Sequence, residues 1–209
     1  RGRGVAAGLH ISIRRQRQMW IRARSEDSAT KDRIAQAAIP LEEIRTQVVA
    51  KSSAVIQGDS KVCRVAECEM GNLVADAMLD RVADQGAQIA IANSGGLRAS
   101  IDAGDVTMGE VLTVLPFQNT LATFQISGQG VIDALENGVS QVEEVKGRFP
   151  QVAGLKFAWD PSVAPNEGRV VEVMVAEGAG FVPIDPAALY IVVTNNYDRT
   201  GGDGYKMLR

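Results

Sequence analysis

Three short segments of this chain place glycines beside polar, charged or aromatic residues in patterns that suit ligand binding. The first is NSGGLR at 93–98, which follows a short apolar run. Gly95 and Gly96 would let the backbone turn sharply and approach a ligand, and Arg98 offers a planar guanidinium that suits phosphate or carboxylate. The alternative is a turn that ends a strand and exposes an arginine. The segment matches neither G-x-G-x-x-G nor a P-loop, so the dinucleotide-binding motifs are absent from it.

The second segment is LPFQNT at 115–120, where Phe117 stands beside a proline and precedes polar residues. An aromatic ring in such a loop could serve as a stacking surface, although a phenylalanine in the core is the alternative. The third segment is NNYDRTGGDGY at 195–205, which concentrates two acids, an arginine, two tyrosines and three glycines. Asp203 within it could accept two hydroxyls of a sugar, or could instead bond to its own backbone in a turn.

The histidine count excludes several classes of catalytic site. The chain has 209 residues and a single histidine, His10. Catalytic zinc sites usually need two or three histidines, and histidine-based triads need one in the core of the site. This chain by itself is therefore a poor candidate for either chemistry.

Charge is distributed unevenly along the chain. Residues 1–24 hold seven arginines and no acid, which leaves 15 basic and 25 acidic residues for the rest. A basic arm can meet nucleic acid or anionic lipid, but this one has no companion motif and no clean amphipathic face. We expect a linker or a truncation remnant there, and no nucleic-acid partner. No run of 18 uncharged apolar residues occurs, so no membrane span is expected.

Cys63 and Cys68 are the two cysteines, with four residues between them. Zinc sites usually use C-x2-C with a second pair, so this spacing argues against a metal. A disulfide at this separation is geometrically possible in a turn or at a strand end. Such a bond is expected in an oxidising compartment, whereas two thiols are expected in a cytosol.

Periodicity and turn residues predict alternating helices and strands without a strict βαβ repeat. That pattern favours an α/β fold, bordering on α+β, with a mixed sheet and not a clean Rossmann fold. Pro40 should break or restart the first helix, and T-x-x-E at Thr107–Glu110 predicts a capping box. The expected helices are 31–50, 71–87, 107 to just before Pro116, and 129–145; the expected strands are 88–92, 120–127, 152–159, 169–175, 189–194 and a short one at 8–13.

Five motifs, taken together and in order, resemble one family. They are CRVAECEMGNLVADAML, NSGGLRASI, VTMGEVLTVLPFQNTL, GRFPQVAGL and NNYDRTGGDGY. This series is similar to the C-terminal domain of the 5′-nucleotidases, a family that includes UDP-sugar hydrolases and 2′,3′-cyclic phosphodiesterases. The resemblance covers residues 50–209.

The resemblance implies a four-layer α-β-β-α domain with mixed sheets over 51–209, preceded by a linker helix at 31–50 and an atypical arginine-rich segment at 1–30. In the family, an N-terminal metallophosphoesterase domain holds two metal ions and performs the hydrolysis. The C-terminal domain grips the nucleoside and decides specificity.

The resemblance also assigns roles to individual residues. Phe117 matches an aromatic that stacks on the base, and Tyr197 stands where a second ring, often phenylalanine, completes the sandwich. Asp203 matches the acid that binds the ribose hydroxyls. Cys63 and Cys68 match a short-range disulfide of some members, which favours an exported protein.

The other matched positions are polar residues or glycines. They are Asn93 and Asn119, which meet the base or order the pocket; Arg64 and Arg98, which reach the phosphate; and Gly95 and Gly96, which contribute backbone contacts.

The metal-binding patterns D-x-H and G-H-x-H of the catalytic domain are absent from this sequence. The resemblance therefore implies a substrate-specificity domain that is inactive alone, has no cofactor of its own, and works with a catalytic domain carrying two divalent metals. The expected ligand is a nucleoside or nucleotide such as adenosine or AMP, in a periplasmic or extracellular setting. The alternatives are a stand-alone nucleoside-binding module and a dimerisation domain that would hold two copies of the protein together as a homodimer.

Overall fold

The computed structural model describes residues 27–209. The predictions made for the arginine-rich segment, for His10 and for a strand at 8–13 lie outside the described residues. The chain divides into two compact units, Arg1–Ile44 and Arg45–Arg209, which are described separately.

The helix α2, Ser28–Thr46, is the main described element before the second unit. It is continuous through Pro40, where the sequence predicted a break. A proline removes one interior hydrogen bond, and the bonds of the neighbouring turns keep this helix intact. The predicted helix also extended to residue 50, but residues 48–52 form a strand, β1 (Val48–Ser52). Its two adjacent β-branched valines suit a strand, and its partner is a strand about 50 residues away that sequence periodicity does not reveal.

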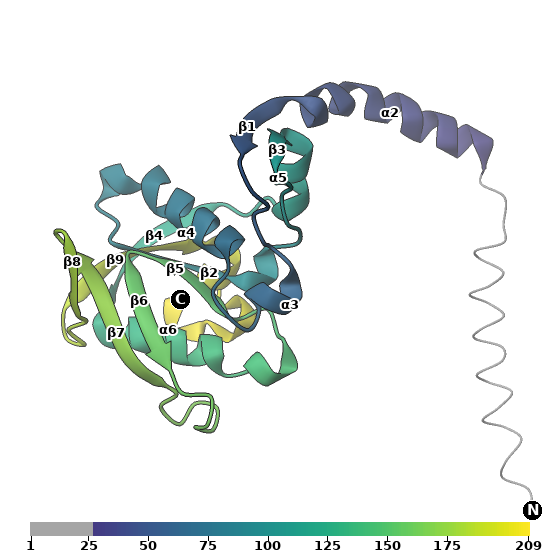
Figure 1. Ribbon diagram of the computed structural model, residues 1–209. Coiled ribbons are helices and arrows are strands. Elements are labelled where there is room, and N and C mark those ends of the chain that lie inside the picture. Colours follow the sequence, from purple (N-terminus) through teal and green to yellow (C-terminus); the bar gives the residue numbers. More distant parts are fainter. Residues whose placement is uncertain (1–26) are drawn as a thin grey trace, which may run out of the picture. The chain divides into compact units, whose positions relative to one another are not determined.

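The second unit mixes helices and strands, as predicted (Figure 1). Short 3-10 turns link several of them. After β1 the helices and strands are α3 (Ser60–Cys63), α4 (Glu69–Arg81), β2 (Ile89–Asn93), β3 (Gly104–Thr107), α5 (Met108–Val114), β4 (Leu121–Ser127), α6 (Gly128–Val139), β5 (Pro150–Ala153), β6 (Leu155–Trp159), β7 (Val170–Glu177), β8 (Gly180–Pro183), β9 (Leu189–Asn195) and α7 (Asn196–Arg199).

The strands form three sheets in the described residues. The central one has the order β4-β9-β2-β5, a second has the order β6-β7-β8, and β1 pairs with β3. In the central sheet β2 runs parallel to β9, while β4–β9 and β2–β5 are antiparallel. The sheet is therefore mixed, and the predicted α/β or α+β class with mixed sheets is confirmed.

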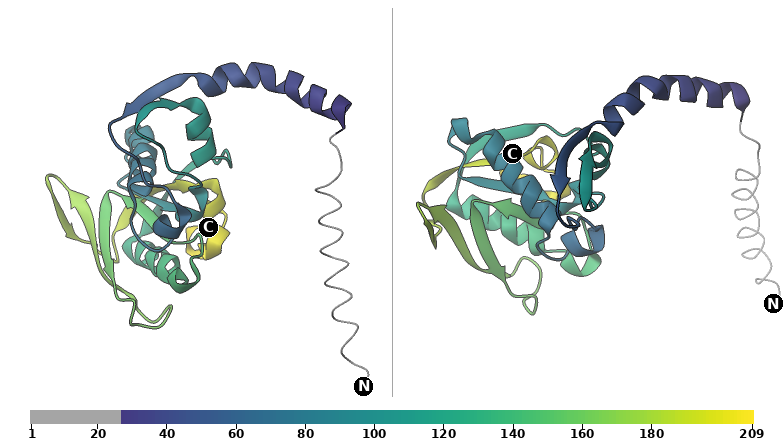
Figure 2. Two further views of the ribbon diagram at one scale, coloured as in Figure 1. Left: turned by 45° about the vertical axis from the view of Figure 1, so that its right-hand side comes forward. Right: turned by 45° about the horizontal axis from the view of Figure 1, so that its top comes forward.

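The two faces of the central sheet bury different side chains. Ile89, Ile91 and Val192 belong to a core shared with α6 and with the β6-β7-β8 sheet. Ala90, Ala92 and Val193 belong to a second core, formed with α4. The two helices therefore cover opposite faces of the central sheet (Figure 2), and two helices with two sheets supply the components of the predicted four-layer domain. Small alanines let α4 approach the sheet closely.

The local signals at helix starts were reliable. Thr107 accepts a hydrogen bond from the Glu110 backbone N–H at 3.3 Å, and the Glu110 carboxylate accepts from the Thr107 N–H at 2.7 Å. This is the predicted capping box of α5, and α5 ends before Pro116 as expected. The helices predicted at 71–87 and 129–145 each end earlier, at Arg81 and Val139, and continue as short 3-10 turns.

The strand predicted at 152–159 is two strands in two different sheets. Gly154 separates β5 from β6 and has φ of +72°, a left-handed conformation that favours glycine. A Cβ at this position would lie 2.0 Å from the Gln88 carbonyl oxygen. The chain therefore leaves the central sheet at Gly154 and enters the second one. The short strands β1, β3 and β8 and the helical turns α3 and α7 were not predicted.

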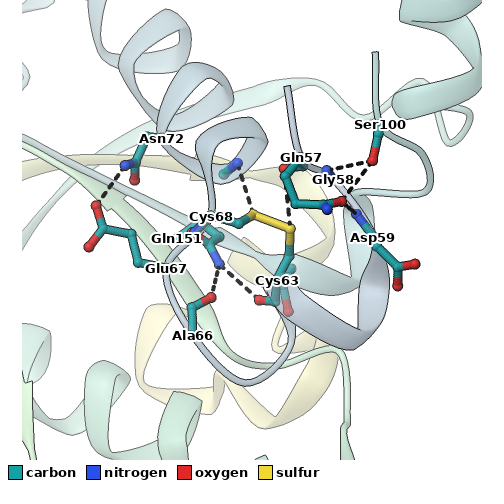
Figure 3. Close-up of a disulfide and its surroundings, with 12 residues drawn as sticks. Gln57, Gly58, Asp59, Cys63, Ala66, Glu67, Cys68, Asn72, Ser100 and Gln151 are labelled. Carbon is teal, nitrogen blue, oxygen red and sulfur yellow. Dashed lines mark hydrogen bonds between the residues drawn. A yellow bond between two sulfur atoms is a disulfide. The ribbon is translucent and has the colours of Figure 1, made fainter. Parts of the chain in front are cut away.

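Cys63 and Cys68 form a disulfide, as the family resemblance implied (Figure 3). Both cysteines are buried. The buried Gln151 side chain fastens the same loop, because its amide donates to the carbonyl oxygens of Cys63 at 2.8 Å and Ala66 at 2.9 Å. Cys68 also caps α4, with its sulfur 3.3 Å from the Gly71 nitrogen. The disulfide loop thus ties the start of α4 to β5.

Reduction of the Cys63–Cys68 bond is expected to lower the free energy of unfolding by about 2 kcal/mol. The closed loop is short, with a sequence separation of 5, and loop-closure entropy predicts about this value for so small a ring. Guanidinium unfolding of the oxidised and reduced chain measures the difference. A variant carrying Cys63→Ala and Cys68→Ala is the control, since its midpoint should not respond to reductant. Equal midpoints for the oxidised and reduced wild-type chain would contradict the prediction.

Among residues 27–209, no helix combines the length and apolar character that crossing a lipid bilayer requires.

Candidate functional site

The ends of four strands meet at one edge of the central sheet. β2 ends at Asn93 and β9 ends at Asn195, and these strands are parallel neighbours, so their carboxyl ends lie together. β4 is antiparallel and begins beside Asn195, through the pair Leu121↔Asn195. β5 is antiparallel to β2 and begins beside Asn93, through the pair Asn93↔Pro150. The loops that precede β4 and β5 therefore reach the same edge, a usual location for ligand sites in open sheets.

A cavity of about 480 Å³ opens at this edge. Eight of the nine substrate-binding residues predicted from the sequence line it, together with Gly147, which was not predicted. The tertiary structure thus gathers positions spread over 140 residues of chain into one pocket. The lining residues are Arg64, Asn93, Gly95, Gly96, Phe117, Asn119, Gly147, Tyr197 and Asp203.

Arg98 is the predicted residue that does not line the cavity. Its guanidinium carbon lies 5.8 Å from the centre of the Phe117 ring, within the range of a cation–π contact. Its backbone N–H donates to the Val114 carbonyl at 3.0 Å. Arg98 therefore contacts a lining residue, and its role toward phosphate stays a prediction.

The two predicted stacking residues expose their rings on the wall of the cavity. Phe117 is 57% exposed and Tyr197 is 44% exposed. The alternative of a core phenylalanine at 117 is therefore wrong. Phe117 stands on the loop between α5 and β4, and Tyr197 stands on the helical turn α7 that follows β9. Aromatic faces from two separate segments are therefore available to a planar ligand.

Asp203 presents its carboxylate to the cavity from a left-handed backbone position. Its φ is +49°, between two glycines, and aspartate tolerates this region better than most residues. The carboxylate accepts hydrogen bonds from the Asn93 side-chain amide at 2.8 Å and from the Tyr197 hydroxyl at 3.1 Å. These bonds join side chains across the site, whereas the alternative prediction had Asp203 bonding to its own backbone.

Gly202 makes room for this arrangement. A Cβ at that position would lie 2.5 Å from the Tyr197 ring, so a larger residue would displace the ring. Burial and the nearby Asp203 carboxylate raise the pKa of the Tyr197 hydroxyl above its usual 10.0. The hydroxyl is therefore protonated at neutral pH and donates to Asp203.

Beneath the cavity lies a buried polar network that the sequence analysis missed. The Asn195 side-chain amide donates to the Asn93 side-chain oxygen at 3.0 Å and to the Asp198 carboxylate at 3.1 Å. The Asp198 carboxylate also accepts from the Asn93 backbone N–H at 3.0 Å. Asp198 thus orients Asn93, and Asn93 in turn bonds to Asp203. The sequence held a signal for this network, because the segment 195–205 contains two acids, Asp198 and Asp203. The sequence prediction gave a role only to Asp203.

Asp198 is fully buried, and one of its carboxylate oxygens has no hydrogen-bond partner within residues 27–209. Desolvation raises the pKa of this carboxyl to about 7; the hydrogen bond from the Asn93 backbone opposes the shift, and the Asp203 charge adds to it. The Asp198 carboxyl therefore gains or loses its proton near neutral pH.

Arg64 brings positive charge to the side of the cavity formed by the turn after α3. It is the C-terminal cap of α3, and one of its terminal nitrogens lies 3.4 Å from the Val145 carbonyl oxygen. Its Nε is buried and has no partner among the described residues. Because Arg64 lines the cavity, its guanidinium charge would attract an anion that enters there.

Gly95 and Gly147 allow two backbone segments to touch at the floor of the site. The Gly95 N–H donates to the Gly147 carbonyl at 2.7 Å. A Cβ on Gly147 would lie 2.8 Å from the Gly95 Cα atom. Glycine at both positions is thus explained by close approach, and Gly147 could have been found from the GRFPQVAGL motif that begins with it.

In the described part of the chain, no group of three or more His, Cys, Asp and Glu side chains is arranged to hold a metal ion.

Comparison with known proteins identifies the relatives of this chain. Residues 45–209 match the family model described as 5′-nucleotidase, C-terminal domain. The chain is 40% identical over 184 residues to the trifunctional nucleotide phosphoesterase protein YfkN of Bacillus subtilis, covering 87% of this chain and 12% of that protein. It is 32% identical over 199 residues to a snake venom 5′-nucleotidase of Macrovipera lebetinus, covering 88% of this chain and 48% of that protein.

A solved structure shares both fold and sequence with this chain. The crystal structure of a 5′-nucleotidase precursor from Thermus thermophilus superposes with a TM-score of 0.82 at 43% identity, covering 90% of this chain and 37% of that one. The chain spans less than half the length of each of these relatives. The family match covers most of the chain and includes every residue that lines the cavity. This chain therefore belongs to the family of 5′-nucleotidase C-terminal domains.

Proposed function

We propose that this chain is the substrate-specificity domain of a 5′-nucleotidase-type metallophosphohydrolase, and that its cavity binds a nucleoside or nucleotide such as adenosine or AMP. The observation that carries the proposal is the gathering of eight predicted residues around one cavity of about 480 Å³. In this proposal the exposed faces of Phe117 and Tyr197 stack on the base, which contributes about 1–3 kcal/mol per ring. The Asp203 carboxylate accepts hydrogen bonds from the ribose hydroxyls, and the Arg64 guanidinium attracts the phosphate.

The proposal places the hydrolysis in a catalytic domain outside this chain, where two divalent metal ions would polarise the phosphate and activate water. The small share of each relative that this chain covers supports that division. The contribution of the present residues is to hold and orient the nucleoside. We further propose an exported protein, periplasmic or extracellular, because the chain carries a disulfide and has a relative described as a venom enzyme.

Calorimetric titration of the purified chain with adenosine and then with AMP tests the proposal. Binding of both ligands is expected, together with no release of phosphate from AMP when divalent metal is added. Hydrolysis that survives repurification would contradict the assignment to a specificity domain. Failure of the folded chain to bind either ligand would contradict the nucleoside site.

Replacing Asp203 by alanine is expected to abolish the preference for ribose over a sugar that lacks the 2′ and 3′ hydroxyls. Hydrogen bonds to a charged group contribute about 1.5–3 kcal/mol, so the wild-type chain should bind adenosine about tenfold to a hundredfold more tightly than 2′,3′-dideoxyadenosine. In Asp203→Ala the two ligands should bind with similar affinity. Asp76→Ala, which changes an exposed aspartate of α4 outside the cavity, is the matched control and should keep the preference. An unchanged ratio of the two affinities in Asp203→Ala would contradict the proposed contact between Asp203 and the ribose.

A further inference from the structure

A second, smaller cavity adjoins the candidate site. Its volume is about 150 Å³, and it shares Asn93, Gly96, Phe117 and Asn119 with the first cavity. Most of the remaining wall is apolar and comes from α4, the end of β2 and the segment around β4. These residues are Val74, Met78, Ala92, Leu97, Leu115, Gln118, Leu121 and Asn195.

The buried amides of Asn93 and Asn195 in this wall use three of their four side-chain N–H groups within the protein. Both donor positions of the Asn195 side chain are used, by the Asn93 side-chain oxygen and the Asp198 carboxylate. The Asn93 side-chain amide donates to Asp203. A guest in the second cavity would therefore meet mainly carbon, contributed by side chains such as those of Met78 and Leu97, which are 8% and 2% exposed. Burial there favours an apolar group, because burying an unpaired polar group is costly.

The size of the cavity narrows the class of guest. An apolar protein cavity of about 150 Å³ holds a benzene molecule, and this cavity has about that volume. A hydrocarbon group the size of a phenyl ring would thus fill it, whereas a whole nucleoside would not fit.

The division of residues between the two cavities indicates which end of a nucleoside lies nearer to the second one. Arg64 and Asp203, the proposed phosphate and ribose contacts, line only the first cavity. Of the two proposed stacking rings, Tyr197 lines only the first cavity, whereas Phe117 lines both. In the proposed pose, the Phe117 side of the base is therefore nearest to the second cavity, and the sugar and phosphate contacts lie away from it.

We propose that the second cavity is a subsite for an apolar substituent on the base, so that the chain binds base-modified nucleosides carrying a group the size of a phenyl ring more tightly than the unmodified nucleoside. This inference rests on the proposed nucleoside function. It adds a ligand class, because the first cavity alone gives no preference for a substituted base.

Affinity measurements with a set of analogues test the subsite. Adenosine, N6-benzyladenosine, 2-phenyladenosine and 8-phenyladenosine are each titrated into the chain by calorimetry. At least one analogue should bind at least about tenfold more tightly than adenosine, which is the gain expected for burying a phenyl ring. Adenosine binding with no gain for any analogue would overturn the subsite and leave the nucleoside function standing. No binding of any of the four to the folded chain would overturn both.

A filling variant with a matched control locates the gain. Leu121 and Leu189 are both exposed and stand at opposite ends of the β4–β9 ladder, and only Leu121 lines the second cavity. In Leu121→Trp the ratio of analogue affinity to adenosine affinity should fall toward one, because the indole occupies the space. In Leu189→Trp the ratio should equal that of the wild-type chain. A gain that survives Leu121→Trp would place the substituent elsewhere and overturn the proposal.

The Met78 methyl group provides a direct readout of ligand binding in the wild-type chain. Met78 lines the second cavity and not the first, and its ¹³C-methyl signal is assigned by its loss in Met78→Leu. The ring current of a bound phenyl group should shift this signal with the tighter-binding analogue and leave it nearly unmoved with adenosine. A signal that responds equally to both ligands would overturn the subsite.

Discussion

Replacing Phe117 by alanine is expected to weaken adenosine binding by about fivefold to more than a hundredfold, the loss that removal of one base–aromatic stack produces. The ring is 57% exposed on the wall of the cavity and belongs to no buried cluster of the described residues. Its removal should therefore leave the free energy of unfolding within about 0.5 kcal/mol of the wild-type value, as for most surface substitutions. A large loss of affinity without a loss of stability would identify a binding ring.

Calorimetry on the wild-type chain and four variants separates stacking from general apolar contact. Phe117→Tyr should retain most of the affinity, since the aromatic face is kept, and Phe117→Leu should lose most of it. Phe181→Ala is the matched control, because Phe181 is a comparably exposed phenylalanine on β8, 44% exposed and outside both cavities. Equal affinities for Phe117→Ala and Phe181→Ala would show that the ring at 117 does not contact the ligand.

The free energy of unfolding of the wild-type chain is expected to fall as the pH rises from about 4 to about 7. In Asp198→Asn this fall should be absent. Burial raises the pKa of Asp198 from 3.8 in a free carboxyl to about 7 in the folded chain. Between these values the folded state binds a proton that the unfolded state has released. The free energy of unfolding therefore falls as pH rises through this window, by an amount on the order of 4 kcal/mol at 1.36 kcal/mol per pH unit.

The other shifted carboxyls act in a different pH range. The hydrogen bonds from Thr107 lower the pKa of Glu110, and the hydrogen bond from Arg169 lowers that of Glu143, each below the usual 4.5. Their contributions to stability are present at higher pH and are lost only as pH falls below that value. The window between pH 4.5 and pH 7 is therefore governed mainly by Asp198.

Denaturant unfolding of the wild-type chain and of Asp198→Asn at intervals from pH 5 to pH 8 measures this effect. The variant cannot ionise at this position, so its stability should change much less over the range, and it should exceed the wild-type stability at pH 8. Asp76→Asn, at an exposed site of α4, should follow the wild-type curve. Parallel curves for the wild-type chain and Asp198→Asn would exclude a raised pKa at Asp198.

The sequence by itself determined the elements whose signals are local. The capping box at Thr107–Glu110 and the strands predicted at 88–92 and 189–194, which correspond to β2 and β9, depend on caps and apolar patterning within a few residues. The sequence also singled out Phe117 beside a proline and Asp203 among glycines, each with a structural alternative, and their binding roles came from the family resemblance. Elements with such local signals can be assigned without knowing the fold.

The tertiary structure decided what depends on partners distant in the chain. β1 forms because β3, about 50 residues later, pairs with it. The strand predicted at 152–159 divides at Gly154, whose left-handed backbone and close contact with the Gln88 carbonyl require glycine. Asp198 acquires its raised pKa only when the fold buries its carboxyl and brings the Asp203 charge near it, against the hydrogen bonds from Asn93 and Asn195, which lower the pKa. Arg98 does not line the first cavity, and its guanidinium carbon lies 5.8 Å from the centre of the Phe117 ring. Strand pairing, burial and packing depend on residues that are distant in the sequence, so local patterns of residues do not predict them.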